Sequence, residues 1–384
     1  MLTLSALAVL AWVWLLAMRG GFWLADQRLP GAPPPIRNWP AVAVLIPARD
    51  EAATIDAVIA AHDRSTYPGP LAILVVDDGS TDGTGEIARA AAARAARAVH
   101  VIEAPALPEG WTGKLHALSI AAAEAARVAP RAEWLLLTDA DIRLAPDTLS
   151  RLVAHALYRR LDMVSLTARL DTGGVWGRLL IPAFIFFFQK LYPFAWVNDP
   201  ARPTAGAAGG CVLLRREVLE DIGGFAAIRG ALIDDCTLAA AVKQGPPRRA
   251  IWLGLAGQAA VSLRDNSRLS SIWSMVARSA YAQLGHSRLR LWGAVAGMVL
   301  VYLAGPLAVL TLPLHGDPPA ALLGLVAWGL SALAYAPTLR QMGLPRALAP
   351  TLPLAAVLYT AMTVSSARAH AAGRGGAWKG RSYS

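Results

Sequence analysis

Residues 134–149 read WLLLTDADIRLAPDTL, so an apolar run leads into two aspartates one residue apart, Asp139 and Asp141. The apolar run predicts a β-strand that is buried on both faces. Side chains at positions i and i+2 of an extended backbone point the same way. Like charges this close repel each other unless a cation or a shared proton offsets the cost. The alternative is a helix cap and a turn residue, because APDTL predicts a helix start directly afterwards.

The chain before this stretch alternates between predicted strands and predicted helices. The strands are 41–47, 71–76, 98–104 and 133–138, and the helices are 51–63, 83–97 and 113–127. This alternation is typical of a doubly wound α/β sheet with parallel strands, in which ligands bind at the carboxyl ends of the strands. Three polar clusters, ARDE, DDGSTDGT and DAD, follow strands directly. We therefore predict a site at that edge of the sheet.

Several other kinds of site lack their sequence signals. DDGSTDGT imitates the first half of an EF-hand calcium loop, but Arg89 stands where the loop needs glutamate and a strand precedes the run. Neither G-x-G-x-x-G nor G-x-x-x-x-G-K-[ST] follows a strand, and the seven histidines form neither H-E-x-x-H nor a plausible triad. A pocket lined by carboxylates instead suits a base, ribose hydroxyls, and a hard divalent cation that bridges a diphosphate.

The composition predicts a membrane protein. Of the 384 residues, 55% are hydrophobic and only 16% are charged, which is too apolar for an ordinary soluble protein. All 26 acids except Asp317 lie between Asp26 and Asp265, so a polar middle separates two apolar ends. The net charge of +10 favours anionic membrane lipids over nucleic acid, since no zinc-finger spacing or basic–aromatic pattern is present. Cys211 and Cys236 form no metal or redox motif.

Four uncharged stretches approach the roughly 20 residues that a membrane-spanning helix needs. They are 2–18, 291–314, 320–339 and 347–366. Arg19 and Arg28 follow the first stretch, and Arg288 and Arg290 precede the second. By the positive-inside rule these arginines predict a multi-pass protein of the inner membrane whose middle domain faces the cytoplasm. The fourth stretch either crosses the membrane or re-enters it, and the side of the C-terminus stays open with it.

Six stretches, taken in order, resemble the family 2 glycosyltransferases of the GT-A fold, which include ceramide glucosyltransferases and dolichyl-phosphate sugar transferases. They are VLIPARDEAATI (44–55), ILVVDDGSTDGT (73–84), GWTGKLHAL (110–118), LLLTDADIRL (135–144), GGCVLLRREVLEDIGGF (209–225) and IDDCTLA (233–239). GWTGK, DAD and the hydrophobic C-terminus are most similar to the hopene-associated glycosyltransferases. The resemblance implies a GT-A doubly wound α/β sheet domain, N-terminal and C-terminal transmembrane helices, and a UDP-sugar donor.

The resemblance also implies roles for the acids that follow the strands. Glu51 and Asp78 would hold the uracil and ribose of the donor, and Asp77 would support the loop. Asp139 and Asp141 match the family's D-x-D pair. Through Mg²⁺ or Mn²⁺ they would neutralise the diphosphate leaving group, with Asp139 also contacting the nucleotide sugar.

Two further residues receive roles from the same resemblance, each with a simpler alternative. Lys114 would add positive charge at the phosphates, or it is only a solvated residue at a helix N-terminus. Asp235 would act as the catalytic base that deprotonates the acceptor hydroxyl, in an in-line attack with inversion. Its alternative is a helix N-cap, and Asp234 could cap the helix while Asp235 catalyses.

Together with the uncharged stretches and the Pro-rich segment, the resemblance divides the chain into five parts: an anchor (1–25), a Pro-rich linker (26–40), the glycosyltransferase domain (41–290), a transmembrane region (291–366) and a basic tail (367–384). Segments near 176–197 and 268–287 have apolar residues near helical spacing, which suits interfacial helices or core helices. Residues 271–287 lack the Q-x-x-R-W motif of processive members, which favours a single transfer over polymer synthesis.

The function expected is therefore a metal-dependent, inverting, membrane-bound hexosyltransferase that moves one sugar from a UDP-sugar to a lipid hydroxyl, with a hopanoid as a candidate acceptor. Two alternatives stay open. One is a polyprenyl-phosphate sugar transferase, whose acceptor is a phosphate oxygen that needs no strong base. The other is a non-catalytic membrane scaffold with a degenerate nucleotide-binding domain.

Overall fold

A computed structural model describes residues 1–31, 35–376 and 379, and the chain divides into two compact units. We call Gln27–Leu170 together with Trp196–Arg264 the sheet unit. The helical unit consists of Met1–Asp26, Asp171–Ala195 and Asp265–Ser384.

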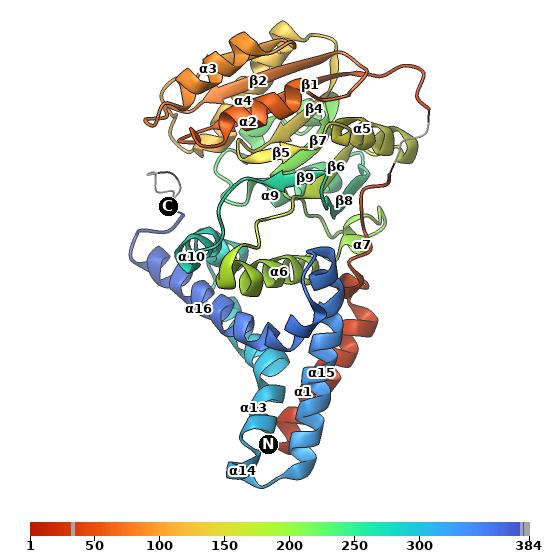
Figure 1. The fold of residues 1–384 in the computed structure, drawn as a ribbon, viewed down its shortest axis with the longest axis vertical. Helices are drawn as coiled ribbons and strands as arrows, with labels where there is room; N and C mark the ends of the chain where they lie inside the picture. The colour runs from red at the N-terminus through yellow and green to blue at the C-terminus, as the bar shows by residue number, and fades with distance from the viewer. Residues whose placement is uncertain (32–34, 377–378, 380–384) are drawn as a thin grey trace. The chain divides into compact units, whose positions relative to one another are not determined.

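The sheet unit is built on seven strands in the order β3-β2-β1-β4-β7-β6-β8 (Figure 1). Their bounds are β1 (Ala41–Ala48), β2 (Leu71–Asp77), β3 (Val99–Glu103), β4 (Ala132–Thr138), β6 (Met163–Thr167), β7 (Cys211–Arg215) and β8 (Ile251–Leu255). The first four strands confirm the predicted alternation and are parallel to one another. The expectation of a wholly parallel sheet is wrong at β7, which runs antiparallel to β4 and β6. Because β6 ends and β7 begins at the same edge, the chain needs no crossover between them.

Helices cover both faces of this sheet, as a doubly wound fold requires. α2 (Ile55–Asp63), α3 (Thr84–Arg94) and α5 (Thr148–Arg159) share one buried cluster with Val44 and Trp134 of the strands. α4 (Gly113–Val128) packs on β1 and β2 and buries Leu115. The helix predicted from residue 51 begins only at Ile55, because residues 51–54 form a turn that the Glu51 carbonyl closes by accepting from the Thr54 N–H at 3.0 Å.

A second, two-stranded sheet lies beside the end of β4. It pairs β5 (Ile142–Leu144) antiparallel with β9 (Ala260–Ser262). The pairing brings the residues after β9 back to the Asp139–Asp141 turn, because Ile142 pairs directly with Ser262.

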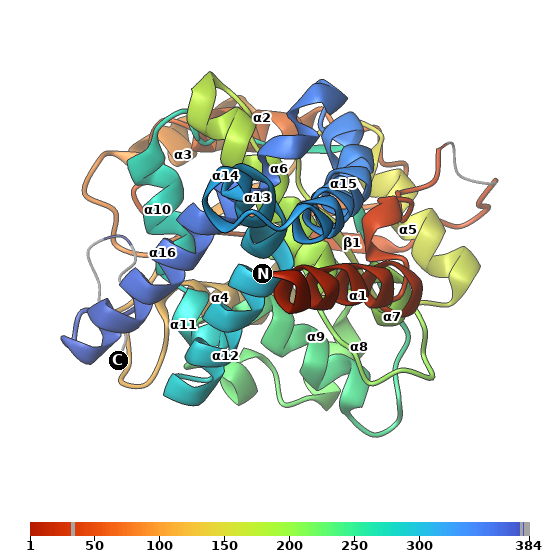
Figure 2. The same ribbon diagram turned by 90° about the horizontal axis from the view of Figure 1, so that it is seen from below.

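The helical unit consists of long apolar helices (Figures 1 and 2). They are α1 (Leu2–Met18), α6 (Gly174–Leu191), α12 (Arg288–Met298) with η3 (Val299–Leu303) and α13 (Ala304–Leu310), α15 (Pro318–Gln341), and η4 (Arg346–Thr351) with α16 (Leu352–Ala371). α1 and α13 both pack against α15. Gly305 of α13 meets Gly324 of α15 so closely that a Cβ on Gly305 would lie 2.7 Å from the Gly324 carbonyl oxygen. Small residues allow such close packing of apolar helices.

Four helical stretches among the described residues are long and apolar enough to cross a membrane: Gly174–Leu191, Arg288–Leu310, Pro318–Gln341 and Arg346–Ala371. Three of them overlap the spans predicted in the C-terminal part of the chain. The predicted N-terminal span is α1, whose 17 residues extend about 25 Å, somewhat less than the roughly 30 Å hydrocarbon core of a bilayer.

The segments predicted to be interfacial are also helical. The first overlaps α6 and contains α7 (Phe194–Val197), and α6 is the remaining helix that is long and apolar enough to cross a membrane. The second contains α10 (Leu269–Ala277) and α11 (Ala280–Gln283). Their place at a membrane surface stays a prediction, as do the limits of the five predicted parts of the chain. Residues 32–34 of the predicted linker and Arg381 of the predicted tail lie outside the described residues.

Lys243, in α9 (Asp234–Gln244), orders the loop that leads into β7. Its side chain is buried, and its ammonium donates to the backbone carbonyls of Val197 at 2.6 Å, Asp199 at 3.0 Å and Thr204 at 2.8 Å. A single charged group thus satisfies carbonyls at the end of α7 and along the loop that follows it. A buried carbonyl that loses its donor costs free energy, because no water replaces the donor.

We expect Lys243→Met to lower the free energy of unfolding of the sheet unit by at least about 2 kcal/mol, because several carbonyls lose their donor together. The midpoint of thermal unfolding of the full-length protein in detergent should fall by several degrees. Arg202→Met is the matched control, since Arg202 is an exposed cation of the same loop whose contact to Asp199 is 3.7 Å long. Equal midpoints for the two variants would contradict this role for Lys243.

Candidate active site

The polar clusters predicted at the strand ends do meet at one edge of the sheet. Ala48 of β1 pairs with Asp77 of β2, and Thr138 of β4 pairs with Cys211 of β7. Because β7 is antiparallel, its first residue lies at the same edge as the last residue of β4. The edge therefore holds the residues after β1, β2 and β4 and the two glycines that precede β7.

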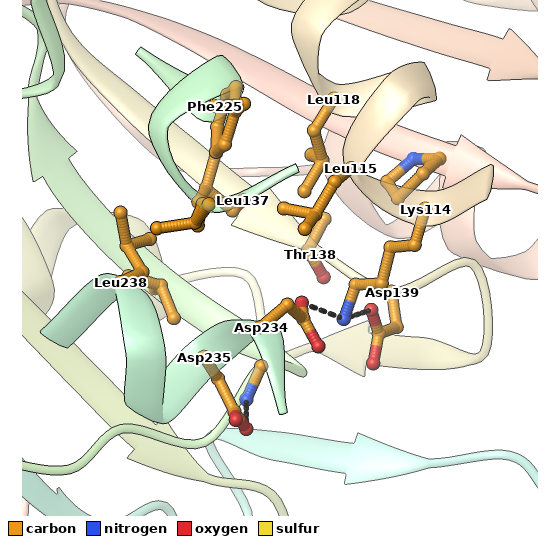
Figure 3. A pocket seen from close by; sticks show the side chains of 14 residues that line it. Lys114, Leu115, Leu118, Leu137, Thr138, Asp139, Phe225, Asp234, Asp235 and Leu238 are labelled. Carbon is orange, nitrogen blue, oxygen red and sulfur yellow. Dashed lines mark hydrogen bonds and ion pairs between the residues drawn. The ribbon is translucent and has the colours of Figure 1, made fainter. Parts of the chain in front are cut away.

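Lys114 lies between two carboxylates from different elements (Figure 3). Its Nζ is 2.9 Å from Asp139 Oδ1 and 3.0 Å from Asp234 Oδ2. Burial alone would lower the pKa of Lys114, but the charges of Asp139 and Asp234 raise it, so the ammonium stays protonated. The alternative of a solvated residue at a helix N-terminus is wrong, because only 21% of the side chain is exposed. A cation in the first turn of α4 opposes the helix dipole, so local helix stability does not explain it.

Asp235 lies in the first turn of α9 and accepts two backbone hydrogen bonds. Its Oδ2 accepts from the Gly209 N–H at 2.8 Å, and its Oδ1 accepts from the Cys236 N–H at 2.7 Å. Burial and the neighbouring charge of Asp234 raise the pKa of Asp235 to about 6, while Lys114 opposes that rise. A carboxylate with such a pKa can exchange a proton near neutral pH.

The capping alternative for these two acids is wrong in part. The N-cap residue of α9 is Ile233, and no side chain caps the helix there. Asp234 is instead directed at Lys114. Asp235 does bond the N–H of the next residue, but it also reaches across to Gly209 before β7, which a cap does not require.

Gly209 is a constraint that the sequence motifs did not single out. A Cβ at this position would lie 2.9 Å from Lys114 Nζ and 3.4 Å from Asp235 Oδ2. Glycine lets the backbone come close enough to donate to Asp235 while Lys114 lies alongside. Residues 209 and 210 are the glycine pair that opens the GGCVLL stretch, and that pair was the available signal.

Asp139 and Asp141 do not share a direction, contrary to the expectation from an extended backbone. β4 ends at Thr138, and the N–H of Ile142 donates to the Asp139 carbonyl at 3.0 Å, so a turn separates the two acids. Asp139 faces Lys114, whereas Asp141 Oδ2 is 3.2 Å from Arg264 Nε. Burial and the charge of Asp139 raise the pKa of Asp141, and Arg264 opposes that rise.

The residues after β1 and β2 form a tight polar loop. Asp77 Oδ1 accepts from the backbone N–H of Ser80 at 3.0 Å and from its hydroxyl, so Asp77 braces this loop. The Arg49 guanidinium donates to the backbone carbonyl of Asp78 and lies 4.0 Å from the Asp78 carboxylate. Asp78 is buried, with only 3% of its side chain exposed. Arg49 stands in the ARDE run but was not assigned a role from the sequence.

Glu51 completes the edge. Its Oε1 lies 3.3 Å from the Arg264 guanidinium, and its backbone N–H donates to the Thr84 hydroxyl at 2.8 Å. All seven site residues predicted from the sequence therefore lie at or after the ends of β1, β2 and β4 or at the starts of α4 and α9. Arg264 was missed, since the residues after a short strand near the end of the unit carry no motif.

The residues at this edge fit a divalent cation by their charge and their donor atoms. Five carboxylates lie around Lys114 and Arg264, those of Glu51, Asp139, Asp141, Asp234 and Asp235. Within the described part of the chain, no three His, Cys, Asp or Glu residues form a cluster that could hold a metal by themselves. One or two carboxylates, completed by water and phosphate oxygens, are the usual protein ligands of Mg²⁺.

Comparisons with known proteins agree with this architecture. The sequence model of glycosyl transferase family 2 matches residues 43–223, which is slightly less than half of the chain. No curated protein gives a significant match to the sequence.

Among solved structures, the mannosyltransferase PcManGT from Pyrobaculum calidifontis, in complex with GDP-Man and Mn²⁺, matches 93% of this chain and 99% of its own, with 22% identity and a TM-score of 0.58. This likeness establishes the fold, which is GT-A. Mannosyl-3-phosphoglycerate synthase from Rubrobacter xylanophilus matches at 21% identity, over 65% of this chain and 75% of its own, with a TM-score of 0.40. Glucosyl-3-phosphoglycerate synthase from Mycobacterium tuberculosis, in complex with Mn²⁺, UDP and phosphoglyceric acid, matches at 21% identity, over 64% and 78%, with a TM-score of 0.42.

The raised pKa of Asp235 predicts a pH-dependent stability. An unfolded aspartate titrates near 3.9, so the folded state binds the proton more tightly and loses stability as the pH rises from about 4 through about 6. Asparagine does not titrate and avoids this loss. We therefore expect the difference in unfolding midpoint, Asp235→Asn minus wild type, to increase by a few degrees between pH 4.5 and pH 7.5. Asp147→Asn, on an exposed side chain, should show no such gain; a flat difference for Asp235→Asn would contradict the raised pKa.

Proposed function

We propose that the chain is a membrane-bound, metal-dependent, inverting glycosyltransferase that transfers a single sugar from a UDP-sugar to a lipid hydroxyl. The observation that carries the proposal is Asp235, a partly buried carboxylate whose pKa is raised to about 6, beside the acids that would hold the donor. At neutral pH this group is largely deprotonated and still basic enough to accept a proton.

The donor would occupy the edge of the sheet. Glu51 and Asp78 would hold the base and the ribose through hydrogen bonds, and Asp77 would keep the loop after β2 in place. Asp139 and Asp141 would hold Mg²⁺ or Mn²⁺, which supplies positive charge to the diphosphate as it leaves. Lys114 would position Asp139 and add a further positive charge on the phosphate side.

The chemical step would be a single displacement at the anomeric carbon. Asp235 takes the proton from the acceptor hydroxyl as that oxygen forms its bond to the anomeric carbon. The bond from that carbon to the phosphate oxygen breaks on the opposite side, and UDP leaves with the electron pair. One in-line attack inverts the configuration. Gly209 would fix the direction of the base, because its N–H holds Asp235 Oδ2.

The apolar helices support a lipid acceptor and a place in the inner membrane. Four stretches of the described chain are long enough to cross a bilayer, and arginines flank the first two predicted spans on the side of the middle domain. We propose that this domain faces the cytoplasm, that 176–197 and 268–287 touch the inner leaflet, and that the chain is most closely related to the hopene-associated glycosyltransferases. A hopanoid is accordingly the first acceptor to test.

We expect Asp235→Asn to reduce turnover by about 10²- to 10⁴-fold, because a hydroxyl is a poor nucleophile until its proton is removed. Donor binding should change little. The test measures transfer from radiolabelled UDP-sugars to a total lipid extract, alongside UDP affinity by calorimetry. The wild-type rate should also fall about tenfold per unit below pH 6, as the base becomes protonated.

Asp147→Asn, a change on an exposed side chain with no assigned role at this edge, should keep the wild-type turnover. If Asp235→Asn binds donor and retains turnover within tenfold of the wild type, Asp235 is not the base. The acceptor would then be a group that arrives ionised, as in a polyprenyl-phosphate sugar transferase. No transfer from any donor by the wild type would favour a non-catalytic scaffold.

We expect nucleotide binding to require both a divalent cation and Asp141. Calorimetry with UDP should show tight binding only when Mn²⁺ or Mg²⁺ is present, and Asp141→Ala should weaken it by at least about tenfold, since a charged contact to the bound complex is lost. GDP is titrated in parallel to identify the base. Equally tight binding by Asp141→Ala, or in the presence of a chelator, would contradict the metal role.

A further inference from the structure

Arg264 joins two acids that follow different strands, Glu51 after β1 and Asp141 after β4. Its Nε lies 3.2 Å from Asp141 Oδ2, and its terminal nitrogen lies 3.3 Å from Glu51 Oε1. Both carboxylates are largely buried, with 10% and 13% of their side chains exposed. The planar guanidinium is suited to bridging two carboxylates in this way. These contacts therefore differ from an ordinary surface ion pair.

The small second sheet holds Arg264 in this place. β9 pairs with β5 so that Ser262 lies opposite Ile142, and the Leu263 N–H donates to the Asp141 carbonyl at 2.7 Å. The Ser262 hydroxyl donates to Asp141 Oδ2 at 3.2 Å. The backbone next to Arg264 is thus tied to the residue whose carboxylate it neutralises.

Under the proposed function, Glu51 and Asp141 also bind ligands. Glu51 would contact the nucleoside and Asp141 would bind the metal, so in both cases the ligand would compete with Arg264 for the carboxylate. A divalent cation at Asp141 would also face the guanidinium at close range, and two positive charges there repel each other. Conversely, a buried carboxylate without a cation is costly, so the donor-free protein needs a positive charge at this point.

We propose that Arg264 is an internal counter-ion of the donor site, which the metal must displace from Asp141 and which the diphosphate of the nucleotide then neutralises. The inference rests on the proposed function and goes beyond it. It predicts that metal binding and nucleotide binding are coupled. The metal alone should bind weakly because its binding leaves the Arg264 guanidinium without a counter-charge, and the diphosphate of the nucleotide supplies that negative charge.

Arg264 lies where the chain passes from one unit to the other. Arg264 is the last residue of the sheet unit, and Asp265 is the first residue of the helical unit's final segment. A displacement of Arg264 therefore acts on the connection that leads to α10.

The test is a titration of the full-length protein in detergent with Mn²⁺, followed by electron paramagnetic resonance, with and without UDP. Arg264→Gln should bind Mn²⁺ alone about tenfold more tightly than the wild type, within the usual range of coupling between ligands. The gain in Mn²⁺ affinity on adding UDP should shrink by the same factor. Arg264→Lys, which keeps the charge but cannot bridge both acids, should fall between the two.

Arg249→Gln is the matched control, because it removes the same charge from an arginine that contacts Asp162 and Asp221 in the same unit. It should leave Mn²⁺ binding at the wild-type value. If the wild type binds Mn²⁺ with UDP but Arg264→Gln binds Mn²⁺ alone no more tightly than the wild type, the counter-ion role is wrong and the proposed function stands. If no protein binds Mn²⁺ under either condition, both fail.

Discussion

The contact of Lys114 with Asp139 and Asp234 is the interaction on which this edge of the protein depends. It joins the end of β4, the start of α4 and the start of α9, which are far apart in the sequence. Without that ammonium, two acids and the neighbouring Asp235 would repel one another around the space that Gly209 leaves open. The same charge also limits how far the pKa of Asp235 can rise, so one lysine both assembles the acids and adjusts the basicity of one of them.

The part of the fold that follows local pattern could be predicted from the sequence. Continuous apolar runs bounded by polar clusters predicted β1, β2 and β4, because strands that are buried on both faces are composed almost entirely of apolar residues. β7 could not be placed in the same way. Its direction depends on where β6 ends and on a long excursion through α6 and α7, which is a property of the tertiary structure. The helical unit could be predicted as apolar helices, while the order in which they pack depends on contacts such as Gly305 with Gly324.

The same distinction between local pattern and tertiary structure applies to the candidate site. Acids directly after strands could be identified because parallel strands bring their carboxyl ends together. The partners of those acids could not. Arg264 follows a three-residue strand, and it reaches Asp141 only because β9 pairs with β5. The direction of Asp141 was predicted wrongly for a related reason: the strand stops one residue before Asp139, and a turn sends the two carboxylates to different cations.

The division of the chain between the two units has a consequence for biosynthesis. Each unit is discontinuous: the sheet unit needs residues on both sides of α6, and the helical unit needs α1, α6 and everything after Arg264. As the chain leaves the ribosome, β1 to β6 emerge before α6, yet β7, which lies between β4 and β6, emerges after it. The central sheet therefore keeps an open position between β4 and β6 while an apolar helix is already exposed. The sheet cannot be completed before α6 has been synthesised, and neither unit corresponds to a contiguous fragment of the chain.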